Sequence, residues 1–327
     1  MSKTIIVTGG CGYIGSHVAR AFKQQGHTVF VIDQVERLHT LKDVDGYLIN
    51  DFASEVALSM LYTLEPDVIV HCAGTSLVGP SITNPSEYYN NNIAKTIRML
   101  NVVKDLPKKP YIMFSSSASV YGQPDTWPIR EDSTIQPISP YGNTKAITEV
   151  ILRDYTAYGI ASICFRYFNA AGAEPVNFDL GQESGATHIV ARVLEASING
   201  TDFTLNGSDF DTHDGSCIRD YVHVWDLAQA HVKGLDFLHN QVRNLSDPAS
   251  HVFNLGTNSG ISNWEIVRYV TKHYGLETLM IMERRQGDPD VLIADAALAN
   301  DVLDWHPEYS SIETIIDSAY KWYTKNV

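Results

Sequence analysis

The sequence predicts an α/β fold, a doubly wound parallel sheet joined to a smaller α/β lobe. Short β-rich segments alternate with helical segments through the first half of the chain. The β-rich segments are apolar along nearly their whole length, which is typical of parallel strands that helices cover on both faces. After Asn169 the alternation weakens, and loops rich in glycine and aspartate follow, such as NGSDFDTHDGSCIRD. This change indicates a second, smaller and more loop-rich lobe.

The elements follow one another in strand–helix order. Strands are predicted at residues 4–8, 28–32, 68–71, 111–115, 161–166 and 251–256, and one more closes at Asp51. These segments are rich in Val, Ile, Phe and Thr, which favour extended backbone. Helices are predicted at about 13–26, 54–64, 85–105 and 141–158. The last can begin with Ser139 as its N-cap and Pro140 as its first helical residue. The late strand at 251–256 indicates that the chain crosses between the lobes more than once.

Composition and charge narrow the classes of function. The chain has 327 residues, with 24 basic against 38 acidic side chains and a formal net charge of −14. No basic stripe runs through it, so we expect neither nucleic acid nor an anionic membrane as a partner. Neither a signal peptide nor an apolar run of about 20 residues is present, so we expect a cytoplasmic protein. The four cysteines form no CxxC pair, so we expect free thiols and no metal site.

The segment TGGCGYIGSH follows the first predicted strand and opens the first helix. Its glycines fit the spacing GxGxxG, which supplies a tight turn, close approach of a pyrophosphate and packing of helix on strand. Asp33 ends the second strand about twenty residues further on, where a carboxylate binds the ribose hydroxyls of NAD and repels the 2′-phosphate of NADP. The pattern predicts a Rossmann-type domain that binds NAD through the loop residues Gly9, Gly12, Tyr13, Ile14 and Gly15.

Two charged residues can affect how the adenosine end of NAD is bound. Arg37 follows the second strand and can soften the preference for NAD over NADP. Asp51 closes the third strand and can reach the adenine amino group. The alternative for Asp51 is an ordinary solvated turn at the end of a strand.

Tyr141 and Lys145 stand four positions apart in SPYGNTK (139–145), so they share one face of the predicted helix. One interpretation is a helix start with two solvated polar side chains. The other is a general base, since an ammonium about 4–5 Å from a phenol contributes roughly the 3 pKa units that catalysis at neutral pH needs. A cationic nicotinamide and the positive helix start act in the same direction. The hydroxyls of FSSSASVYG (114–122) lie at the carboxyl edge of the sheet, where they can orient a substrate oxygen.

Several segments together carry a resemblance to a known family: TGGCGYIGSH, EYYNNN (87–92), SSSASVYG, YGNTK, RYFNAAG, DGSCIRDYVHVWDLAQAH (214–231) and RRQGDP (284–289). With them the chain resembles the extended short-chain dehydrogenase/reductase family and, within it, the UDP-glucose 4-epimerases. The similarity covers essentially the whole length. It implies a tightly held NAD, a UDP-sugar substrate and a homodimer. We expect an NAD-binding Rossmann domain at 1–170, with returning segments near 221–256, and a lobe at 171–327 that mainly binds the UDP-sugar.

The resemblance also assigns roles to single residues. Tyr141 would be the acid/base, Lys145 its partner and a ligand of the nicotinamide ribose, and Ser117 a hydrogen-bond partner of the sugar O4. Further cofactor contacts would be Phe52, Cys72, Ala73, Gly74, Asn91, Ser115 and Tyr167, in addition to Asp33 and Asp51. The UDP-sugar would be held by Phe168, Asn169, His188, Ile189, Thr204, Arg219, Arg285 and Asp288. Taken alone, each arginine is equally typical of a surface salt bridge, and His188 of a polar residue at a helix start.

The implied reaction interconverts UDP-glucose and UDP-galactose, a step of galactose metabolism, by oxidation at C4, rotation of the 4-keto sugar and re-reduction. Ala118 and Ser119 occupy positions at which related dehydratases and decarboxylases carry acidic residues, which favours simple epimerisation. Two alternatives stay open. The substrate can be a UDP-N-acetylhexosamine (UDP-N-acetylglucosamine and UDP-N-acetylgalactosamine) or a UDP-pentose, because Leu292 stands where hexose-specific members often have tyrosine. The chain can also be a non-catalytic NAD sensor. Two departures from the family are Ser76, where some members carry lysine, and the short segment 34–50.

Overall fold

The computed structural model describes residues 2–244, 248–284 and 288–325. Its centre is a seven-stranded sheet with the order β11-β6-β5-β4-β1-β2-β3, in which every neighbouring pair is parallel. The strands are β1 (Thr4–Thr8), β2 (Thr28–Asp33), β3 (Gly46–Ile49), β4 (Val68–His71), β5 (Tyr111–Ser117), β6 (Ser162–Tyr167) and β11 (Ser250–Leu255). The predicted doubly wound parallel sheet is confirmed, including the late strand that returns to its edge.

The strand order reverses between β1 and β4. From β1 the chain builds outward through β2 to β3, then crosses back to β4 and continues through β5 to β6 on the other side. The connections on the two sides therefore leave the sheet in opposite directions, which opens a crevice at the carboxyl ends of these strands. Most of the functional residues predicted from the sequence lie at this edge.

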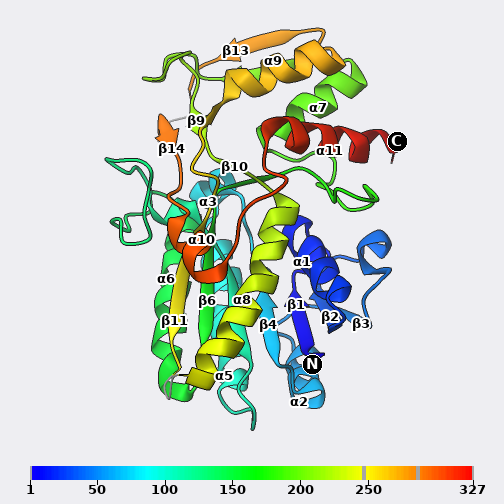
Figure 1. The fold of residues 1–327 in the computed structure, drawn as a ribbon, viewed down its shortest axis with the longest axis vertical. Helices are drawn as coiled ribbons and strands as arrows, with labels where there is room; N and C mark the ends of the chain where they lie inside the picture. Colours follow the sequence, from blue (N-terminus) through cyan, green and yellow to red (C-terminus); the bar gives the residue numbers. More distant parts are fainter. Residues whose placement is uncertain (1, 245–247, 285–287, 326–327) are drawn as a thin grey trace.

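Helices cover both faces of the sheet (Figure 1). On one face lie α1 (Tyr13–Gln24) and α8 (Val224–Asn244), and on the other lie α2 (Glu55–Leu64), α5 (Lys95–Val103) and α6 (Pro140–Asp154). Side chains of β1 alternate between the two layers, since Ile5 and Val7 are buried on the α1 face and Ile6 on the α2 face. Burying each such side chain stabilises the fold by about 1.5–3 kcal/mol, which explains why the strand is apolar at successive positions.

The helix predicted at about 85–105 is wrong as a single element. It consists of α4 (Pro85–Tyr89), a π-helical turn at Asn90–Ala94 and then α5. In this turn the buried Asn92 side chain accepts from the backbone N–H of Thr75 at 2.8 Å and donates to the Thr75 carbonyl at 3.0 Å. The π turn, which is wider than an α-helical turn, thereby ties the helix to the loop that follows β4.

A second group of elements packs beyond the carboxyl edge of the sheet (Figure 1). It includes α7 (Ile189–Asn199), α9 (Asn263–Tyr274), α11 (Ile312–Lys325) and the paired strands β8 (Phe203–Asn206) and β13 (Leu279–Met282). Their shared core contains Val193, Phe203, Ile266 and Ile315. Within residues 171–327, however, α8, β11 and α10 (Ala297–Leu303) pack against the sheet. The exact domain boundary stays a prediction.

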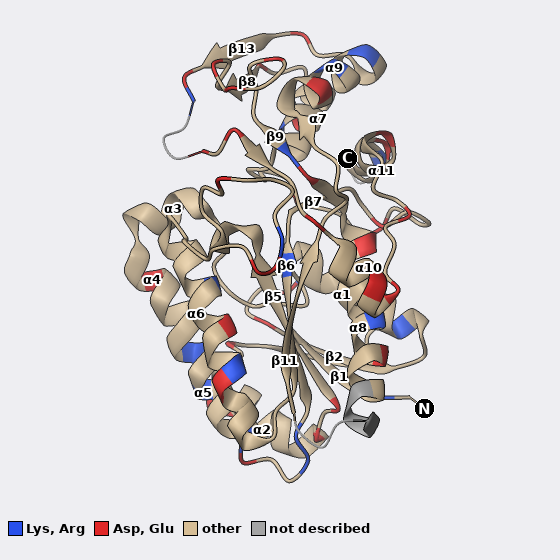
Figure 2. Cartoon of the chain, turned by 60° about the vertical axis from the view of Figure 1, so that its left-hand side comes forward, with Lys and Arg blue, Asp and Glu red and all other residues tan. Residues whose placement is uncertain are grey.

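Short strands join the two groups. β7 (Asn169–Ala171) pairs with β10 (Tyr221–His223), and β9 (Ile218–Arg219) pairs with β12 (Ile261–Ser262) and β14 (Val291–Leu292). Basic residues lie scattered among acidic ones over the whole chain and form no continuous stripe in the view of Figure 2. Within the described part of the chain, no helix has the length and apolar character that crossing a membrane requires.

Candidate active site

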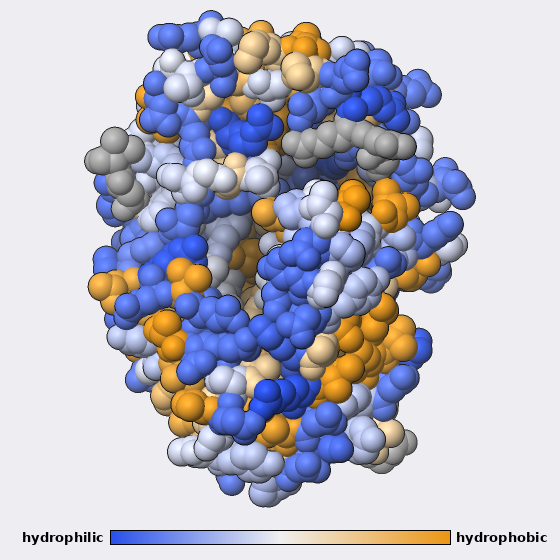
Figure 3. All heavy atoms as spheres, turned by 180° about the vertical axis from the view of Figure 1, so that it is seen from behind, coloured by the Kyte–Doolittle hydropathy of each residue, from blue (hydrophilic) through white to orange (hydrophobic). Residues whose placement is uncertain are grey.

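A cavity of about 730 Å³ lies at the carboxyl edge of the sheet. Figure 3, which views the molecule from behind, shows a hollow near the middle of that face. The loops that follow β1 to β6 line the cavity, together with residues from the segment 182–188 and Leu292 of β14. The structure brings together in it the predicted site residues Gly9, Gly12, Tyr13, Ile14, Gly15, Asp33, Phe52, Cys72, Ala73, Gly74, Asn91, Ser115, Ser117, Tyr141, Lys145, Tyr167, Phe168, Asn169 and His188.

The glycine turn after β1 forms one wall in which a side chain has no room. Gly9 has a φ of 71°, and a Cβ there would lie 2.7 Å from the backbone nitrogen of Ala73. A Cβ on Gly15 would lie 2.2 Å from the carbonyl oxygen of Gly9. Gly12 is the N-cap of α1 and supplies no side-chain hydrogen bond to the helix. The first N–H groups of α1 are thus open to an anion, as a dinucleotide pyrophosphate requires.

Asp33 and Arg37 lie beside this turn. The carboxylate of Asp33 accepts from the backbone N–H groups of Cys11 at 2.9 Å and of Val35 at 3.0 Å. Arg37 donates to the Cys11 carbonyl at 3.0 Å, and its Nε lies 3.7 Å from a carboxylate oxygen of Glu183. Because the guanidinium is partnered in this way, the negative charge of Asp33 dominates, which fits NAD better than NADP.

Asp51 is not among the residues that line the cavity, although its neighbours Asn50 and Phe52 are. Its carboxylate forms an ion pair of 2.6 Å with Lys95 and accepts from the backbone N–H of Ala53 at 2.9 Å. Burial acts to raise the pKa of Asp51, but these two contacts outweigh it and the pKa is lowered. The geometry is that of a turn at a strand end, and the predicted adenine contact stays a prediction.

Tyr141 and Lys145 are held at the start of α6. Ser139 caps the helix by accepting from the Gly142 N–H at 3.1 Å, with Pro140 as the first helical residue, as the sequence predicts. Both Tyr141 and Lys145 are buried, so the interpretation of two solvated side chains is wrong. Lys145 Nζ donates to the Ser115 carbonyl at 2.7 Å and lies 5.6 Å from the centre of the Tyr141 ring.

The predicted acidic phenol is not a property of the protein alone. Burial raises the pKa of Tyr141 to about 12, against the opposing effect of a hydrogen bond with Ser117. Burial also lowers the pKa of Lys145 to about 8. The desolvation of the phenol therefore exceeds what the lysine contributes, because the ammonium points to the Ser115 carbonyl. A further positive charge in the cavity is required to bring Tyr141 into the neutral range.

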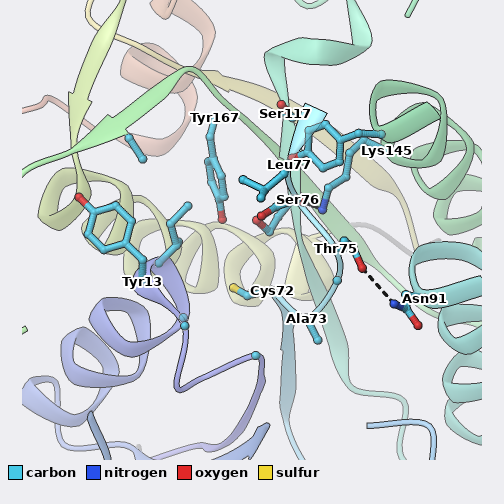
Figure 4. Close-up of a pocket in the computed structure, with 18 of the residues that line it drawn as sticks. Tyr13, Cys72, Ala73, Thr75, Ser76, Leu77, Asn91, Ser117, Lys145 and Tyr167 are labelled. Carbon is cyan, nitrogen blue, oxygen red and sulfur yellow. Dashed lines mark hydrogen bonds between the residues drawn. The ribbon is translucent and has the colours of Figure 1, made fainter. Parts of the chain in front are cut away.

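Ser117 ends β5 directly beside this pair. Its hydroxyl accepts from the backbone N–H of Ser119 and contacts the Ser119 hydroxyl, both at 3.1 Å. In Figure 4 Tyr167 stands between Tyr13 on one side of the cavity and Lys145 on the other. The same view shows Asn91 of the π turn, whose side-chain amide donates to the Thr75 hydroxyl at 3.0 Å. The hydroxyl, phenol and ammonium groups needed for proton transfer thus lie in one cavity.

Several predicted substrate residues lie outside the cavity. Arg219 of β9 pairs through Nη2 with Asp288 at 2.8 Å, and it sits opposite Leu292 in the pairing of β9 with β14. Thr204 lies in β8, where its carbonyl accepts from Arg192 at 3.2 Å. Ile189 begins α7 directly after His188. Arg285 lies outside the described residues.

In two loops that line the cavity, the sequence predicted only some of the lining residues. One is the loop after β4, where Thr75, Leu77 and Val78 join the predicted residues, and the other contributes Gln182 and residues 185–187. The first follows a predicted strand at the ligand-binding edge, so its position signals it. The second lies far along the chain, in a segment whose sequence carries no recognisable motif.

Comparisons with known proteins place this geometry in context. The profile of the NAD dependent epimerase/dehydratase family matches residues 5–256. A UDP-glucose 4-epimerase of Halalkalibacterium halodurans is 39% identical over 98% of this chain and 96% of its own length.

Two solved structures are similar over nearly the whole chain. The UDP-glucose 4-epimerase of Brucella ovis in complex with NAD is 35% identical, with a TM-score of 0.91 over 98% of each chain. The UDP-glucose 4-epimerase of Bifidobacterium longum in complex with NAD⁺ and UDP is 31% identical, with a TM-score of 0.90 over 99% of this chain and 98% of that chain.

Proposed function

This chain belongs to the NAD dependent epimerase/dehydratase family, and we propose that it interconverts UDP-glucose and UDP-galactose with NAD as its cofactor. The observation that carries the proposal is the meeting of Tyr141, Lys145 and Ser117 in one cavity with the glycine turn after β1. The relatives named above are UDP-glucose 4-epimerases. The Brucella ovis structure holds NAD, and the Bifidobacterium longum structure holds NAD⁺ and UDP. The reaction is an isomerisation, because the hydride removed from the sugar is returned to it.

The residues that line the cavity fit NAD. The turn at Gly9 and Gly15 packs too tightly against neighbouring backbone to carry a side chain, and the open N-terminus of α1 suits a pyrophosphate. Asp33 would bind the adenosine ribose, and Lys145 would bind the nicotinamide ribose. When bound, NAD accepts the hydride from sugar C4 and gives it back.

Tyr141 moves the proton in this scheme. It would remove the proton of the sugar O4 during oxidation and return it during reduction. Its pKa, about 12 in the protein alone, must fall for this role, and the positive charge of a bound oxidised nicotinamide would lower it together with the Lys145 ammonium. Ser117, which lines the cavity together with Tyr141, would hold O4 within reach.

The residues beside Ser117 limit the chemistry. Related dehydratases and decarboxylases carry acidic residues directly after the active-site serine or threonine, which Ser117 corresponds to here. Ala118 and Ser119 line the cavity at this point, and neither bears a carboxylate. The site therefore supports inversion at C4 without elimination.

Residues in and beside the cavity would bind the UDP moiety. Asn169 and His188 line the cavity and would contact the diphosphate. Arg219 is adjacent but paired with Asp288, so we propose that a diphosphate takes over this guanidinium on binding, since Arg–phosphate bonds are frequently bidentate. Arg285, Thr204 and Ile189 stay predictions from the resemblance.

The experiment that tests the function follows UDP-galactose by NMR with purified protein and no added NAD. We expect the gluco epimer to appear, and Tyr141→Phe to slow its appearance by at least about 100-fold, the lower range for general acid–base catalysis. Parallel incubation with UDP-N-acetylgalactosamine tests the alternative that Leu292, which lines the cavity, admits a larger sugar. If UDP-galactose is not converted even with NAD supplied, the proposal is wrong.

We propose further that the enzyme is a homodimer located in the cytoplasm. Large apolar side chains are exposed on the adjoining helices α3 (Val78–Thr83) and α6, with Ile82 64%, Ile147 40% and Val150 43% exposed. This face supports association of two copies. Light scattering should give twice the chain mass for the natural protein and a single chain for Val150→Glu. The cytoplasmic location rests on the sequence alone and can be checked by cell fractionation.

A further inference from the structure

Tyr167 lines the cavity and also contacts a histidine that is buried in the protein interior. It ends β6 and lines the cavity, and its hydroxyl oxygen lies 2.8 Å from Nε2 of His231. His231 belongs to α8, is fully buried and packs its ring 4.7 Å from that of Phe165 on the same strand as Tyr167. It does not line the cavity, so any effect it has on the site passes through Tyr167.

The partners of His231 decide which way its hydrogen bonds run. Nδ1 lies 2.8 Å from the carbonyl oxygen of Leu227, one helical turn earlier. A carbonyl can only accept, so Nδ1 carries the ring proton. Burial lowers the pKa of His231 to about 4, so the ring is neutral near pH 7 and Nε2 has a free lone pair. The hydroxyl of Tyr167 must therefore donate to His231.

This direction determines what Tyr167 presents to the cavity. Its proton points to α8, so on the cavity side its oxygen offers only lone pairs. The Ser115 carbonyl accepts from Lys145 at 2.7 Å. The Ser115 carbonyl and the Tyr167 hydroxyl thus offer oxygen lone pairs near the Lys145 ammonium. In the proposed reaction, such lone pairs would stabilise a cationic nicotinamide ring.

The same bond distinguishes the two phenols of the site. Tyr167 and Tyr141 are close enough for their charges to interact, and burial holds the pKa of Tyr167 well above its ordinary value. With its proton held by a neutral, buried imidazole, Tyr167 stays protonated while Tyr141 titrates.

We propose that His231 is a positioning residue of the site: by accepting the hydroxyl proton of Tyr167, it holds that phenol as a neutral hydrogen-bond acceptor next to the reacting groups. The proposal rests on the function proposed above. It predicts that the acceptor at Nε2, and not the mere presence of a buried side chain, matters for turnover.

Two amide variants separate these possibilities. His231→Asn keeps a donor for the Leu227 carbonyl but loses the acceptor for Tyr167, whereas His231→Gln can place its amide oxygen near the position of Nε2. We expect kcat for UDP-galactose to fall about three- to tenfold in His231→Asn, the equivalent of one neutral hydrogen bond. KM should change less than about twofold, because His231 does not line the cavity and so does not contact the substrate. His231→Gln should recover most of the lost kcat.

The bond partner and a distant histidine supply the controls. In a Tyr167→Phe background, which lacks the hydroxyl, His231→Asn should cause no further loss of kcat. His223→Asn alters a buried histidine of β10, which contacts Ser318 at 3.0 Å and accepts from the Trp225 N–H at 3.0 Å, and it should leave kcat unchanged.

A spectroscopic readout keeps the test independent of turnover. Nitrogen NMR of the natural protein should show His231 protonated at Nδ1 and bare at Nε2, and Tyr167→Phe should shift only the Nε2 resonance. A protonated Nε2 would overturn the proposal, as would equal kcat losses in His231→Asn and His231→Gln, or none in either. If the natural protein fails to convert UDP-galactose, the proposed function is wrong, and the NMR result still decides the role of His231.

Discussion

At the scale of single residues, the glycine turn after β1 packs closely against the loop after β4. Gly9 and Gly26 both have left-handed backbone, with φ of 71° and 78°. A Cβ on Gly9 would lie 2.7 Å from the Ala73 nitrogen, whereas a Cβ on Gly26 would meet no atom within 4 Å. The two positions therefore separate backbone strain from steric clash.

We expect Gly9→Ala to lower the unfolding temperature more than Gly26→Ala and to remove bound NAD. Both substitutions carry the cost of left-handed backbone, about 1–2 kcal/mol, but only the first also pushes the turn off the loop after β4. Calorimetry and the nucleotide released per chain measure the two effects. Equal melting temperatures and equal nucleotide contents would contradict the account of the turn.

At the scale of elements, α6 is the helix whose start carries the chemistry. Its first turn holds Tyr141, and its N-cap Ser139 accepts from Gly142 N at 3.1 Å. Ser54 performs the same task for α2, accepting from Ala57 N at 3.2 Å. The motif SPYGNTK made this helix start predictable, because its cap and its proline are local signals.

Replacing either cap by alanine should cost about 1 kcal/mol of stability. We expect Ser139→Ala also to lower kcat, because fraying of the first turn displaces Tyr141. Ser54→Ala should leave kcat unchanged, since α2 supplies no residue to the cavity. Denaturant titration and initial rates on the two variants check this. A Ser139→Ala enzyme with natural kcat would mean that packing, and not the cap, fixes Tyr141.

The interruption between α4 and α5 was not predictable from its residues. The helical pattern of 85–105 continues through Asn90–Ala94, and nothing local distinguishes a π turn from an α turn. The turn forms beside the loop after β4, where Asn92 makes two hydrogen bonds with Thr75. A contact between residues 17 positions apart decides the geometry, so a reading of local periodicity misses it.

At the scale of the whole molecule, the sheet was predictable and the second lobe much less so. Parallel strands are buried on both faces and show as apolar runs, and the glycine turn and Asp33 mark the crevice. The placement of Arg219 was not predictable, because its bond to Asp288 joins residues 69 positions apart. The same holds for the loop carrying Gln182, which reaches the cavity only through the packing of the two lobes.

Buried titratable groups set how stability depends on pH. His17, His71, His223 and His231 are buried, and burial lowers their pKa values from 6.5 to about 4, 3, 3 and 4 respectively. Below about pH 6.5 the unfolded chain therefore binds protons that the folded chain does not. The folded state becomes less stable as the pH is lowered through this range. Asp220 opposes this, because burial raises its pKa to about 6, so its stabilising contribution is lost as pH rises through that value. Asp226 is shifted in the same direction as Asp220.

Because several histidines act against fewer carboxylates, we expect the unfolding temperature to fall between pH 7 and pH 5. Each histidine that stays neutral in the folded state contributes about 1 kcal/mol per pH unit averaged over this range, approaching about 1.4 kcal/mol well below pH 6.5. The slope should be smaller in His223→Asn, which removes one such group from β10 at a position that does not line the cavity. Calorimetry of both proteins over this range measures the difference. A stability that stays level or rises toward pH 5 would show that the buried carboxylates outweigh the histidines, and equal slopes in the two proteins would show that His223 has the same pKa in the folded and unfolded states.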